Sequence, residues 1–179
     1  GTGDQLIVDA LMEVQGADLA FSPGFRWGTS LLPGQPITRE WVMDMTATTY
    51  SYATLTEMKG DMVKTVMEDV ADNLFNPDPY YQQGGDMVRV GGMTYAFNPL
   101  ETMGKRVSDL RLGGKLIDPN KTYKVAGWAP VSEEAAKAGN PMVWDLVEQW
   151  LKARGGKVSA RQPNMPKLTG AAPNPGLAS

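Results

Sequence analysis

Arg26 has the side chain in this sequence that is best suited to bind an oxyanion. It follows an apolar run over residues 17–21 and a Pro23-Gly24 break, a pattern that predicts an arginine just beyond the end of a buried strand. A guanidinium donates two parallel hydrogen bonds to the oxygens of a sulfonate or phosphate, and a fixed cation stabilises charge that develops on them. The other interpretation is a surface arginine in a loop salt bridge, and these residues alone leave both open.

The segment over residues 76–86 is a second candidate for a functional role. Prolines and glycines flank two tyrosines and two glutamines, so no regular element can run through it, and such loops are often functional or mobile. This segment either forms a binding surface or is a structural Ω-loop with its tyrosines folded underneath. Its aromatic and amide side chains are Tyr80, Tyr81, Gln82 and Gln83.

Two residue types are absent, and their absence limits the chemistry. The sequence has no cysteine, which excludes disulfides, zinc-thiolate sites and thiol catalysis. It also has no histidine, so a Ser-His-Asp triad and a histidine-based metal centre are both excluded within this chain. If the intact protein uses a metal, the metal must therefore be bound elsewhere.

Charge and hydropathy narrow the possible partners. The chain has 179 residues, enough for one domain with a core, and a net charge of −3 that argues against a nucleic-acid partner. No apolar run approaches the ~20 residues that a membrane span needs, and no signal peptide begins the chain. Because the sequence opens with Gly1-Thr2-Gly3 and not Met, we expect a processed or excised chain whose targeting signal has been lost.

Amphipathic spacing predicts a helix near each end of the chain. The first covers residues 4–15, with Asp4 as a candidate cap and Gly16 as the stop. The last is expected to follow Asn140, with Pro141 at its first position, a placement that proline favours. Its buried face would consist of Met142, Val143, Leu146, Val147, Trp150 and Leu151.

Two further helices are predicted between them. Thr38 is a candidate N-cap for a short helix, and a longer helix covers residues 61–74. Asp69, Asp72 and Asn73 lie on or near the longer helix and are expected to be solvated or to cap it, not to bind a metal. Its apolar stripe, which should fill the core, consists of Met62, Val63, Val66, Met67, Val70, Ala71 and Leu74.

Most of the remaining pattern is typical of strands. Gly113-Gly114 predicts a hairpin turn, and Gly91-Gly92 is interpreted as a second pair of turn glycines. Neither pair opens a helix after a strand, as a phosphate-binding loop would require. The expected strand regions are residues 46–58, 87–90, 93–97, 106–112, 115–117 and 122–128.

These elements predict an α+β fold in which helices pack on a mixed β-sheet. Residues 1–156 would form the domain. The tail over residues 157–179 is rich in proline, glycine, alanine and asparagine, so it is expected to wrap the surface or to be disordered.

The order of these elements resembles the C-terminal domain of the 5′-nucleotidase family over about residues 3–155. The resemblance is carried by the motifs GDQLIVDALMEVQGADLAFSPGFR, GQPITREWVMDM, TLTEMKGDMVKTVMED, VGGMTYAFNP and LGGKLIDPNKTYKVAG. Two other stretches are more similar to the SoxB thiosulfohydrolases of bacterial sulfur oxidation. These are SPGFRWGTSLLPGQPIT and VADNLFNPDPYYQQGGDMVRVGGMTY.

The resemblance implies one half of a two-domain periplasmic enzyme. A calcineurin-like metallophosphoesterase domain, absent from this chain, would precede it and hold two metal ions, usually manganese; this chain itself would hold no cofactor. The enzyme would hydrolyse the terminal sulfonate of a cysteine-S-thiosulfonate on the swinging arm of the carrier SoxYZ and release sulfate. Its active site would lie between the two domains, and this chain alone should be inactive.

The resemblance also suggests roles for individual residues. Arg26 stands at the family's substrate-binding arginine. Trp27 would wall the pocket or contact the carrier arm, although a packing role is open, and Gly28 would serve backbone geometry. Trp128 stands where nucleotidases have a strand end near the base, but the following WAPVSEEAAKAGNP departs from their glycine-rich loop, so its role is left open.

For the loop, the resemblance suggests a channel for the carrier arm. The tyrosines at 80 and 81 would line it, and Gln82 and Gln83 would hydrogen-bond the arm's backbone. Gly84 and Gly85 would allow close approach, and Asp86 would orient Arg26 or cap a turn.

Two alternatives stay open. One is a 5′-nucleotidase-like phosphohydrolase, disfavoured by the changed loops at Arg26 and Trp128. The other is a protein-binding module without catalysis, whose interface would use Trp27, Trp128 and the two tyrosines of the loop.

Overall fold

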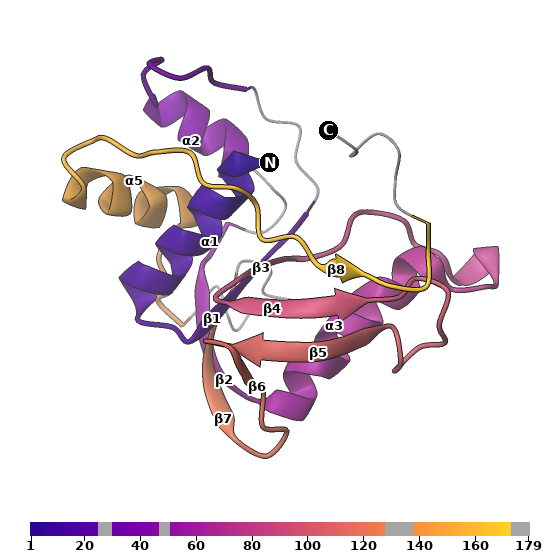
Figure 1. Ribbon diagram of the computed structural model, residues 1–179. Coiled ribbons are helices and arrows are strands. Elements are labelled where there is room, and N and C mark those ends of the chain that lie inside the picture. The colour runs from indigo at the N-terminus through magenta and orange to yellow at the C-terminus, as the bar shows by residue number, and fades with distance from the viewer. Residues whose placement is uncertain (25–29, 47–50, 128–137, 173–179) are drawn as a thin grey trace.

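A mixed four-stranded sheet lies at the centre of the fold (Figure 1). The computed structural model describes residues 1–24, 30–46, 51–127 and 138–172. β1 runs parallel to β7 and antiparallel to β3, and β2 runs antiparallel to β7. The strands are β1 (Leu19–Ser22), β2 (Thr54–Lys59), β3 (Arg89–Gly91) and β7 (Thr122–Gly127), in the spatial order β2-β7-β1-β3.

The two faces of this first sheet bury different clusters, because neighbouring residues of a strand point to opposite sides. On β1, Ala20 belongs to one cluster and Leu19 to the other. On β7, Ala126 and Val125 divide in the same way. The small alanines therefore lie on a single face, where a helix can approach the strands closely.

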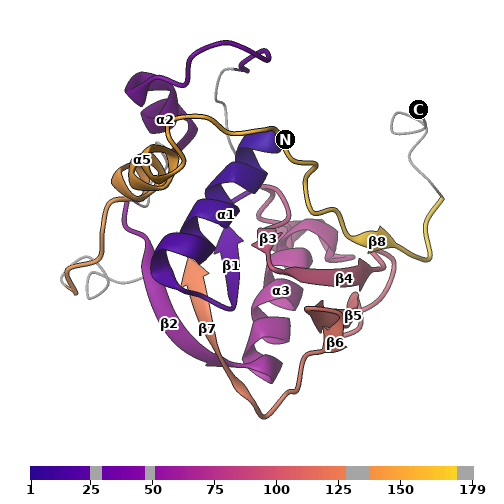
Figure 2. The same cartoon turned by 60° about the vertical axis from the view of Figure 1, so that its left-hand side comes forward.

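Helices cover that alanine face: α1 (Thr2–Gln15) packs on it, and α2 (Arg39–Thr46) and α5 (Val143–Ala153) pack beside α1 (Figure 2). A Cβ on Gly91 would lie 2.9 Å from the sulfur of Met12 and 3.0 Å from Cβ of Val8. The interpretation of Gly91 as a turn glycine is therefore wrong. It is the last residue of β3, and its missing side chain makes room for α1.

The opposite face packs on α3 (Gly60–Phe75), which lies between the first sheet and a second one (Figure 2). The strands of the second sheet are β4 (Met93–Phe97), β5 (Val107–Leu112), β6 (Lys115–Leu116) and β8 (Lys167–Leu168), in the order β6-β5-β4-β8. Gly113 and Gly114 have φ angles of 56° and 80° and form the predicted hairpin turn between β5 and β6. The prediction of an α+β fold with mixed sheets and packed helices is confirmed.

The apolar stripe of α3 is narrower than the sequence predicts. Val63, Met67 and Ala71 are buried, but Met62 is 50% exposed. One residue corresponds to about 100° around a helix, so Met62 points about 100° away from its buried neighbour Val63, toward solvent. The prediction that Met62 fills the core is wrong.

Capping signals in the sequence correctly predicted where α1 ends and which residue caps α2, but not which residue caps α1. Gly16, with φ of 63°, ends α1, and the hydroxyl of Thr38 caps α2 by accepting a hydrogen bond of 3.1 Å from the amide of Trp41. The predicted cap of α1 is wrong. The helix starts at Thr2, and Asp4 lies within its first turn.

The start of α5 also differs from the prediction. Asn140 and Pro141 both precede the helix, so Asn140 is not its cap and Pro141 is not its first residue. The carbonyl of Pro141 accepts a hydrogen bond of 2.9 Å from the amide of Ala53, and the amide of Val143 donates one of 2.9 Å to the carbonyl of Ser51. These bonds hold the chain in a short extended ladder, which delays the helix by two residues.

The C-terminal segment over residues 157–172 passes across α1 and ends in the second sheet (Figure 1). Arg161 forms an ion pair of 2.7 Å with Asp9 of α1. The amide of Asn164 donates a hydrogen bond of 2.9 Å to the side chain of Gln5. β8 then pairs in parallel with β4.

Candidate functional site

The first sheet brings three of the predicted site segments to one edge. β1 and β7 are parallel, and their carboxyl ends are Ser22 and Gly127. β3 is antiparallel to β1, and its first residue, Arg89, pairs with Ser22. The chain therefore leaves the sheet after Ser22 and after Gly127, and enters it before Arg89, at the same edge. The carboxyl ends of parallel strands are a common place for ligand sites.

Four of the predicted site residues lie outside the described part of the chain: Arg26, Trp27, Gly28 and Trp128. The described residues that flank them show where the chain leaves the first sheet. Gly127 is the last residue of β7, and the carbonyl of Gly24 accepts a hydrogen bond of 3.4 Å from Arg89. The backbone that leads into the segment with Arg26 is therefore tied to the start of β3.

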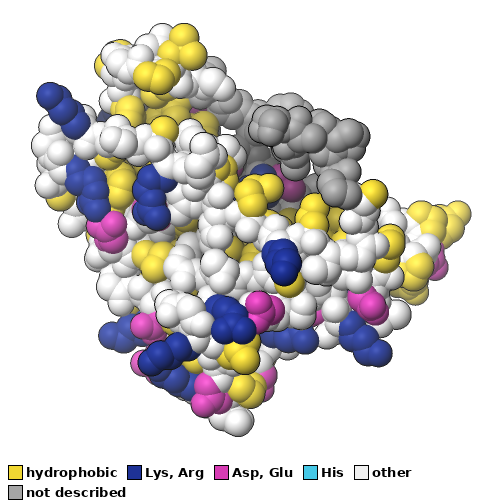
Figure 3. Space-filling view, in the orientation of Figure 1, with side chains coloured by type: hydrophobic (Ala, Val, Ile, Leu, Met, Phe, Trp, Pro, Cys, Tyr) yellow, Lys and Arg dark blue, Asp and Glu magenta, His cyan; other side chains and the backbone are white. Residues whose placement is uncertain are grey.

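The tyrosines of the loop face solvent. They belong to the short 3₁₀ helix η1 (Pro79–Tyr81), and their side chains are 96% exposed at Tyr80 and 67% exposed at Tyr81. The turn after α3 projects from the molecule at the right of Figure 1, and hydrophobic side chains gather at the same tip in Figure 3. The alternative of tyrosines folded under the loop is therefore wrong for both rings, which are free to contact a partner.

The loop is held in shape by its own hydrogen bonds. The side chain of Asp78 accepts one of 3.0 Å from the amide of Tyr80, and the side chain of Asn76 accepts one of 2.9 Å from the amide of Asp78. The side-chain amide of Gln82 donates one of 2.7 Å to the carbonyl of Asn76, while Gln83 is exposed. Gln82 therefore braces the loop itself, which reduces its capacity to bind the backbone of another chain.

Asp86 ends the loop in an ion pair that the sequence did not suggest. Its carboxylate lies 2.6 Å from Nη2 of Arg89, and the same guanidinium lies 3.6 Å from the carboxylate of Asp4 in α1. Burial acts to lower the pKa of Arg89, but the hydrogen bond and charge of Asp86 and the charge of Asp4 outweigh it, so the pKa is raised. Arg89 is thus a firmly charged group that joins the loop to α1.

Arg89 is the residue that sequence reasoning missed. The signal for it was a single arginine in the otherwise apolar run Met87-Val88-Arg89-Val90, which reads as a strand. Alternation along that strand predicts which face the side chain takes, but not that the distant carboxylate of Asp4 and the carbonyl of Gly24 converge on it.

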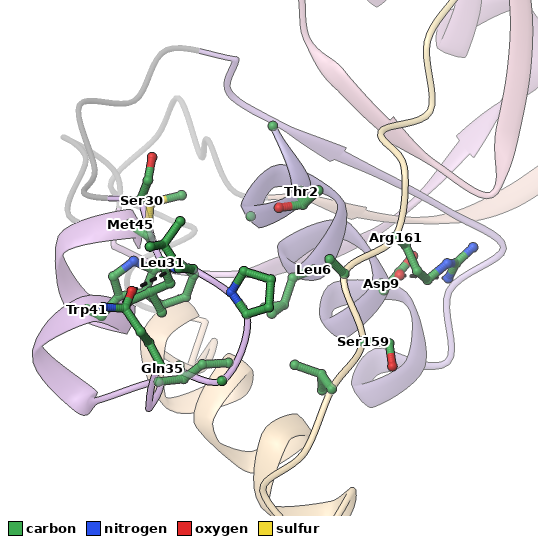
Figure 4. Close-up of a pocket in the computed structure, with 18 of the residues that line it drawn as sticks. Thr2, Leu6, Asp9, Ser30, Leu31, Gln35, Trp41, Met45, Ser159 and Arg161 are labelled. Atoms are coloured by element: carbon green, nitrogen blue, oxygen red, sulfur yellow. Dashed lines mark hydrogen bonds and ion pairs between the residues drawn. The ribbon is translucent and has the colours of Figure 1, made fainter.

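A groove of about 760 Å³ opens between α1, α2 and the C-terminal segment (Figure 4). Residues of α2, such as Trp41, stand on one side, and Leu6 of α1 and Ser159 of the C-terminal segment stand on the other (Figure 4). The groove is lined by hydrophobic side chains and by the polar side chains of Ser30 and Gln35. The ion pair of Arg161 with Asp9 also lines it. Ser30, the first described residue after the segment that carries Arg26, is among the residues that line the groove. Its volume is in the range of small-ligand pockets.

The described ranges contain neither a metal cluster nor a membrane-spanning helix. No group of three or more acidic side chains there could hold a metal ion, and the sequence has no histidine or cysteine to add to one. No helix in those ranges combines the length and the apolar composition that a membrane crossing requires.

The family follows from comparison with known proteins. The sequence profile of the 5′-nucleotidase C-terminal domain matches residues 2–134. The chain belongs to the 5′-nucleotidase C-terminal domain family.

Similarity to solved structures is more specific. The sulfate thiohydrolase SoxB of Thermus thermophilus, solved with glycerol, aligns over 96% of this chain with 34% identity and a TM-score of 0.83. The NAD nucleotidase of Haemophilus influenzae aligns over 96% with 18% identity and a TM-score of 0.72, and a putative 5′-nucleotidase of Staphylococcus aureus over 92% with 17% identity and 0.69. The predicted resemblance to SoxB is confirmed, whereas the two nucleotidases show the shared fold alone.

The chain spans 32% of the SoxB chain, 33% of the NAD nucleotidase and 36% of the putative 5′-nucleotidase. None of the curated protein sequences matches it.

Proposed function

We propose that this chain is the substrate-side domain of a two-domain SoxB-type hydrolase that releases sulfate from a cysteine-S-thiosulfonate on the carrier SoxYZ. The observation that carries the proposal is the 34% identity to SoxB over 96% of the chain, against 17–18% for the nucleotidases of the same fold. The match includes the segment after residue 134, where the general family profile ends.

In this reaction, a water oxygen bonds to the sulfonate sulfur and the sulfur–sulfur bond breaks. The electron pair stays with the sulfur that remains on the carrier cysteine, which takes up a proton, and sulfate leaves. Negative charge on the sulfonate oxygens must be stabilised throughout. A guanidinium is the group in the predicted site that can do so, because it donates two hydrogen bonds and keeps its charge at any physiological pH.

Arg26 takes this role in our proposal, with Trp27 and Trp128 as pocket walls and Gly28 shaping the backbone. The convergence of the flanking residues Ser22, Gly24 and Gly127 on one sheet edge supports it. The exposed rings of Tyr80 and Tyr81 would contact the carrier arm, with Gln83 and Gly85 beside them, while Gln82 and Asp86 serve the shape of the loop.

In our proposal, the two metal ions implied by the resemblance, expected to be manganese, are bound by the N-terminal metallophosphoesterase domain. This is consistent with the described residues of this chain, among which no group of three or more acidic side chains could hold a metal ion. The N-terminal domain is the first partner of this one, and SoxYZ the second. We place the intact enzyme in the periplasm, where its proposed carrier substrate would be found.

The test is sulfate release from thiosulfonate-loaded SoxYZ by the intact two-domain enzyme. Arg26→Ala should lower kcat/KM by ~10²-fold or more, the usual loss when one transition-state donor is removed. Arg111→Ala is a matched control, since Arg111 bonds Asp109 and the carbonyl of Gly114 at the hairpin of the second sheet. Turnover within twofold of the parent for Arg26→Ala would reject the proposed role.

A further inference from the structure

Arg89 joins three separate parts of the chain at the edge of the candidate site. Its Nη1 donates a hydrogen bond of 2.9 Å to the carbonyl of Met87, and its Nη2 donates one of 2.6 Å to Asp86 at the end of the tyrosine loop. Nη2 also reaches the carbonyl of Gly24 at 3.4 Å, and Nε lies 3.6 Å from the carboxylate of Asp4. The guanidinium thus contacts the loop, the exit of β1 and the first turn of α1 together.

The backbone at Gly24 packs tightly against the same residues. A Cβ on Gly24 would overlap the carbonyl oxygen of Met87, and would lie 3.0 Å from Nη1 of Arg89 and 3.1 Å from Cβ of Asp86. Gly24 therefore packs closely between Asp86, at the end of the loop, and the guanidinium of Arg89. Because a chain spans at most about 3.6 Å per residue, whatever holds Gly24 also limits where Arg26, two residues later, can go.

We propose that Arg89 is a positioning residue for the oxyanion site: it holds Gly24 against the Asp86 end of the tyrosine loop, and so sets where the segment with Arg26 leaves the sheet. This inference rests on the proposed function of Arg26. Arg89 acts through the backbone and does not touch the substrate.

The planar guanidinium is needed because its partners lie in different directions. Carboxylates stand on two sides of it, and carbonyl oxygens accept from two of its nitrogens. A lysine would bring one ammonium, a point charge that cannot span them all. Arg89→Lys should therefore recover only part of the function that Arg89→Gln removes.

The experiment is a double-mutant cycle in the intact two-domain enzyme, with sulfate release from thiosulfonate-loaded SoxYZ as the activity. Arg89→Gln should lower kcat/KM about tenfold or more, because small misplacements of a binding group are costly. In the Arg26→Ala background, the same substitution should change kcat/KM less than twofold, since two residues acting through one contact are not additive. Arg111→Gln is the control and should leave activity within twofold of the parent.

Asp86→Asn is a second, milder variant that keeps the test valid if Arg89→Gln does not fold. It removes the charge at a partner whose side chain is 47% exposed, and should lower kcat/KM by a smaller factor that also vanishes without Arg26. Hydrogen–deuterium exchange gives a readout independent of activity: the peptide that contains Gly24 should exchange faster in Arg89→Gln than in Arg111→Gln.

The outcomes separate the two proposals. If Arg26→Ala lowers activity but Arg89→Gln has no effect, or has the same effect with and without Arg26, Arg89 does not act through that segment and the inference is wrong. Unchanged exchange at Gly24 also overturns it. If Arg26→Ala itself leaves activity unchanged, the proposed function fails first, and the inference fails with it.

Discussion

Arg106 is 1% exposed, yet it carries a full charge into the junction between α3 and β5. Its Nη1 lies 2.7 Å from the carboxylate of Asp72, and its Nη2 donates a hydrogen bond of 3.0 Å to the carbonyl of Phe75. Beside it, the buried carboxylate of Glu68 accepts hydrogen bonds from the amides of Gly104, Arg106 and Val107. Buried charges persist where partners of this kind replace water.

Asp72 is therefore more than the solvated or capping residue that the sequence suggests, and this has a consequence for stability. Hydrogen bonds from Arg106 and then Asn76 hold the pKa of Asp72 below its ordinary value of 3.8. A carboxyl whose pKa is lowered by folding stabilises the fold above its unfolded pKa, and this stabilisation is lost as the pH falls through the folded pKa.

We expect Asp72→Asn to lower the free energy of unfolding near neutral pH, and the difference from the parent to shrink as the pH falls below about 4. Urea unfolding of the parent and the variant at about pH 6 and about pH 3 measures this difference in the free energy of unfolding. Asp69→Asn, an exposed position on the same helix, is the control and should show little effect at either pH. A difference in the free energy of unfolding between Asp72→Asn and the parent that stays constant with pH would contradict the lowered pKa of Asp72.

At the scale of elements, the loop after α3 is a hydrogen-bonded turn that carries two exposed rings. The side chains of Asn76 and Asp78 accept hydrogen bonds from backbone amides of the turn. The amide of Gly84 donates a hydrogen bond of 3.2 Å to the carbonyl of Asn73, so the loop closes on the helix that precedes it. Tyrosines held outward in this way lose little entropy on binding, which is why they are common in interfaces.

The double substitution Tyr80→Ala and Tyr81→Ala should therefore weaken binding of the carrier. In the intact enzyme we expect KM for loaded SoxYZ to rise about tenfold, consistent with the loss of a binding hot spot, with kcat nearly unchanged. Free cysteine carrying the same thiosulfonate lacks the arm, so its hydrolysis should be unaffected.

Leu116→Ala is the control for that pair, because Leu116 is also an exposed hydrophobic residue but lies at the hairpin of the second sheet. An equal loss with carrier and with free cysteine thiosulfonate would place the tyrosines in catalysis or folding instead. No change with either substrate would remove them from the binding surface.

At the scale of the whole molecule, the C-terminal segment forms hydrogen bonds with both sheets. The side-chain amide of Asn164 donates hydrogen bonds to the carbonyl of Val90, at 3.2 Å, and to that of Met93, while its backbone amide bonds Gln5 of α1. Val90 belongs to β3 and Met93 to β4, so one residue spans the point where the chain passes between the sheets.

Asn164→Ala removes both side-chain hydrogen bonds and leaves the carbonyls of two buried residues, Val90 and Met93, without that donor. We expect it to lower the free energy of unfolding by about 1–3 kcal/mol, measured by urea denaturation. Gln162→Ala, two residues earlier and exposed, should change it by less than about 0.5 kcal/mol. Equal stability of the two variants would show that β8 docks without the help of Asn164.

Much of the fold could be predicted because local signals act over a few residues. Gly16 adopts a left-handed conformation that ends α1, Thr38 supplies an oxygen to cap α2, and Gly113-Gly114 matches the twist of a two-residue hairpin. The motif order of the 5′-nucleotidase C-terminal domain family and the two stretches similar to SoxB were equally visible, since they depend on the identity and order of residues alone.

The candidate site was predictable in part, because residue type suggests chemistry but not placement. A guanidinium after a strand suggests an oxyanion site, and a Pro-rich loop with tyrosines suggests an exposed contact. That Arg89 meets the carboxylate of Asp4 and the carbonyl of Gly24 depends on where the chain folds back, which neither periodicity nor propensity encodes.

The sequence by itself thus determined most of the element types, the family and the candidate residues. Only the tertiary structure decided that β3 and β4 part into different sheets, that Gly91 lies under α1, and that α5 starts after an extended ladder with residues 51–53. The physical reason is range: capping and turn chemistry join neighbours in sequence, whereas these outcomes are set by packing and hydrogen bonds between segments tens of residues apart.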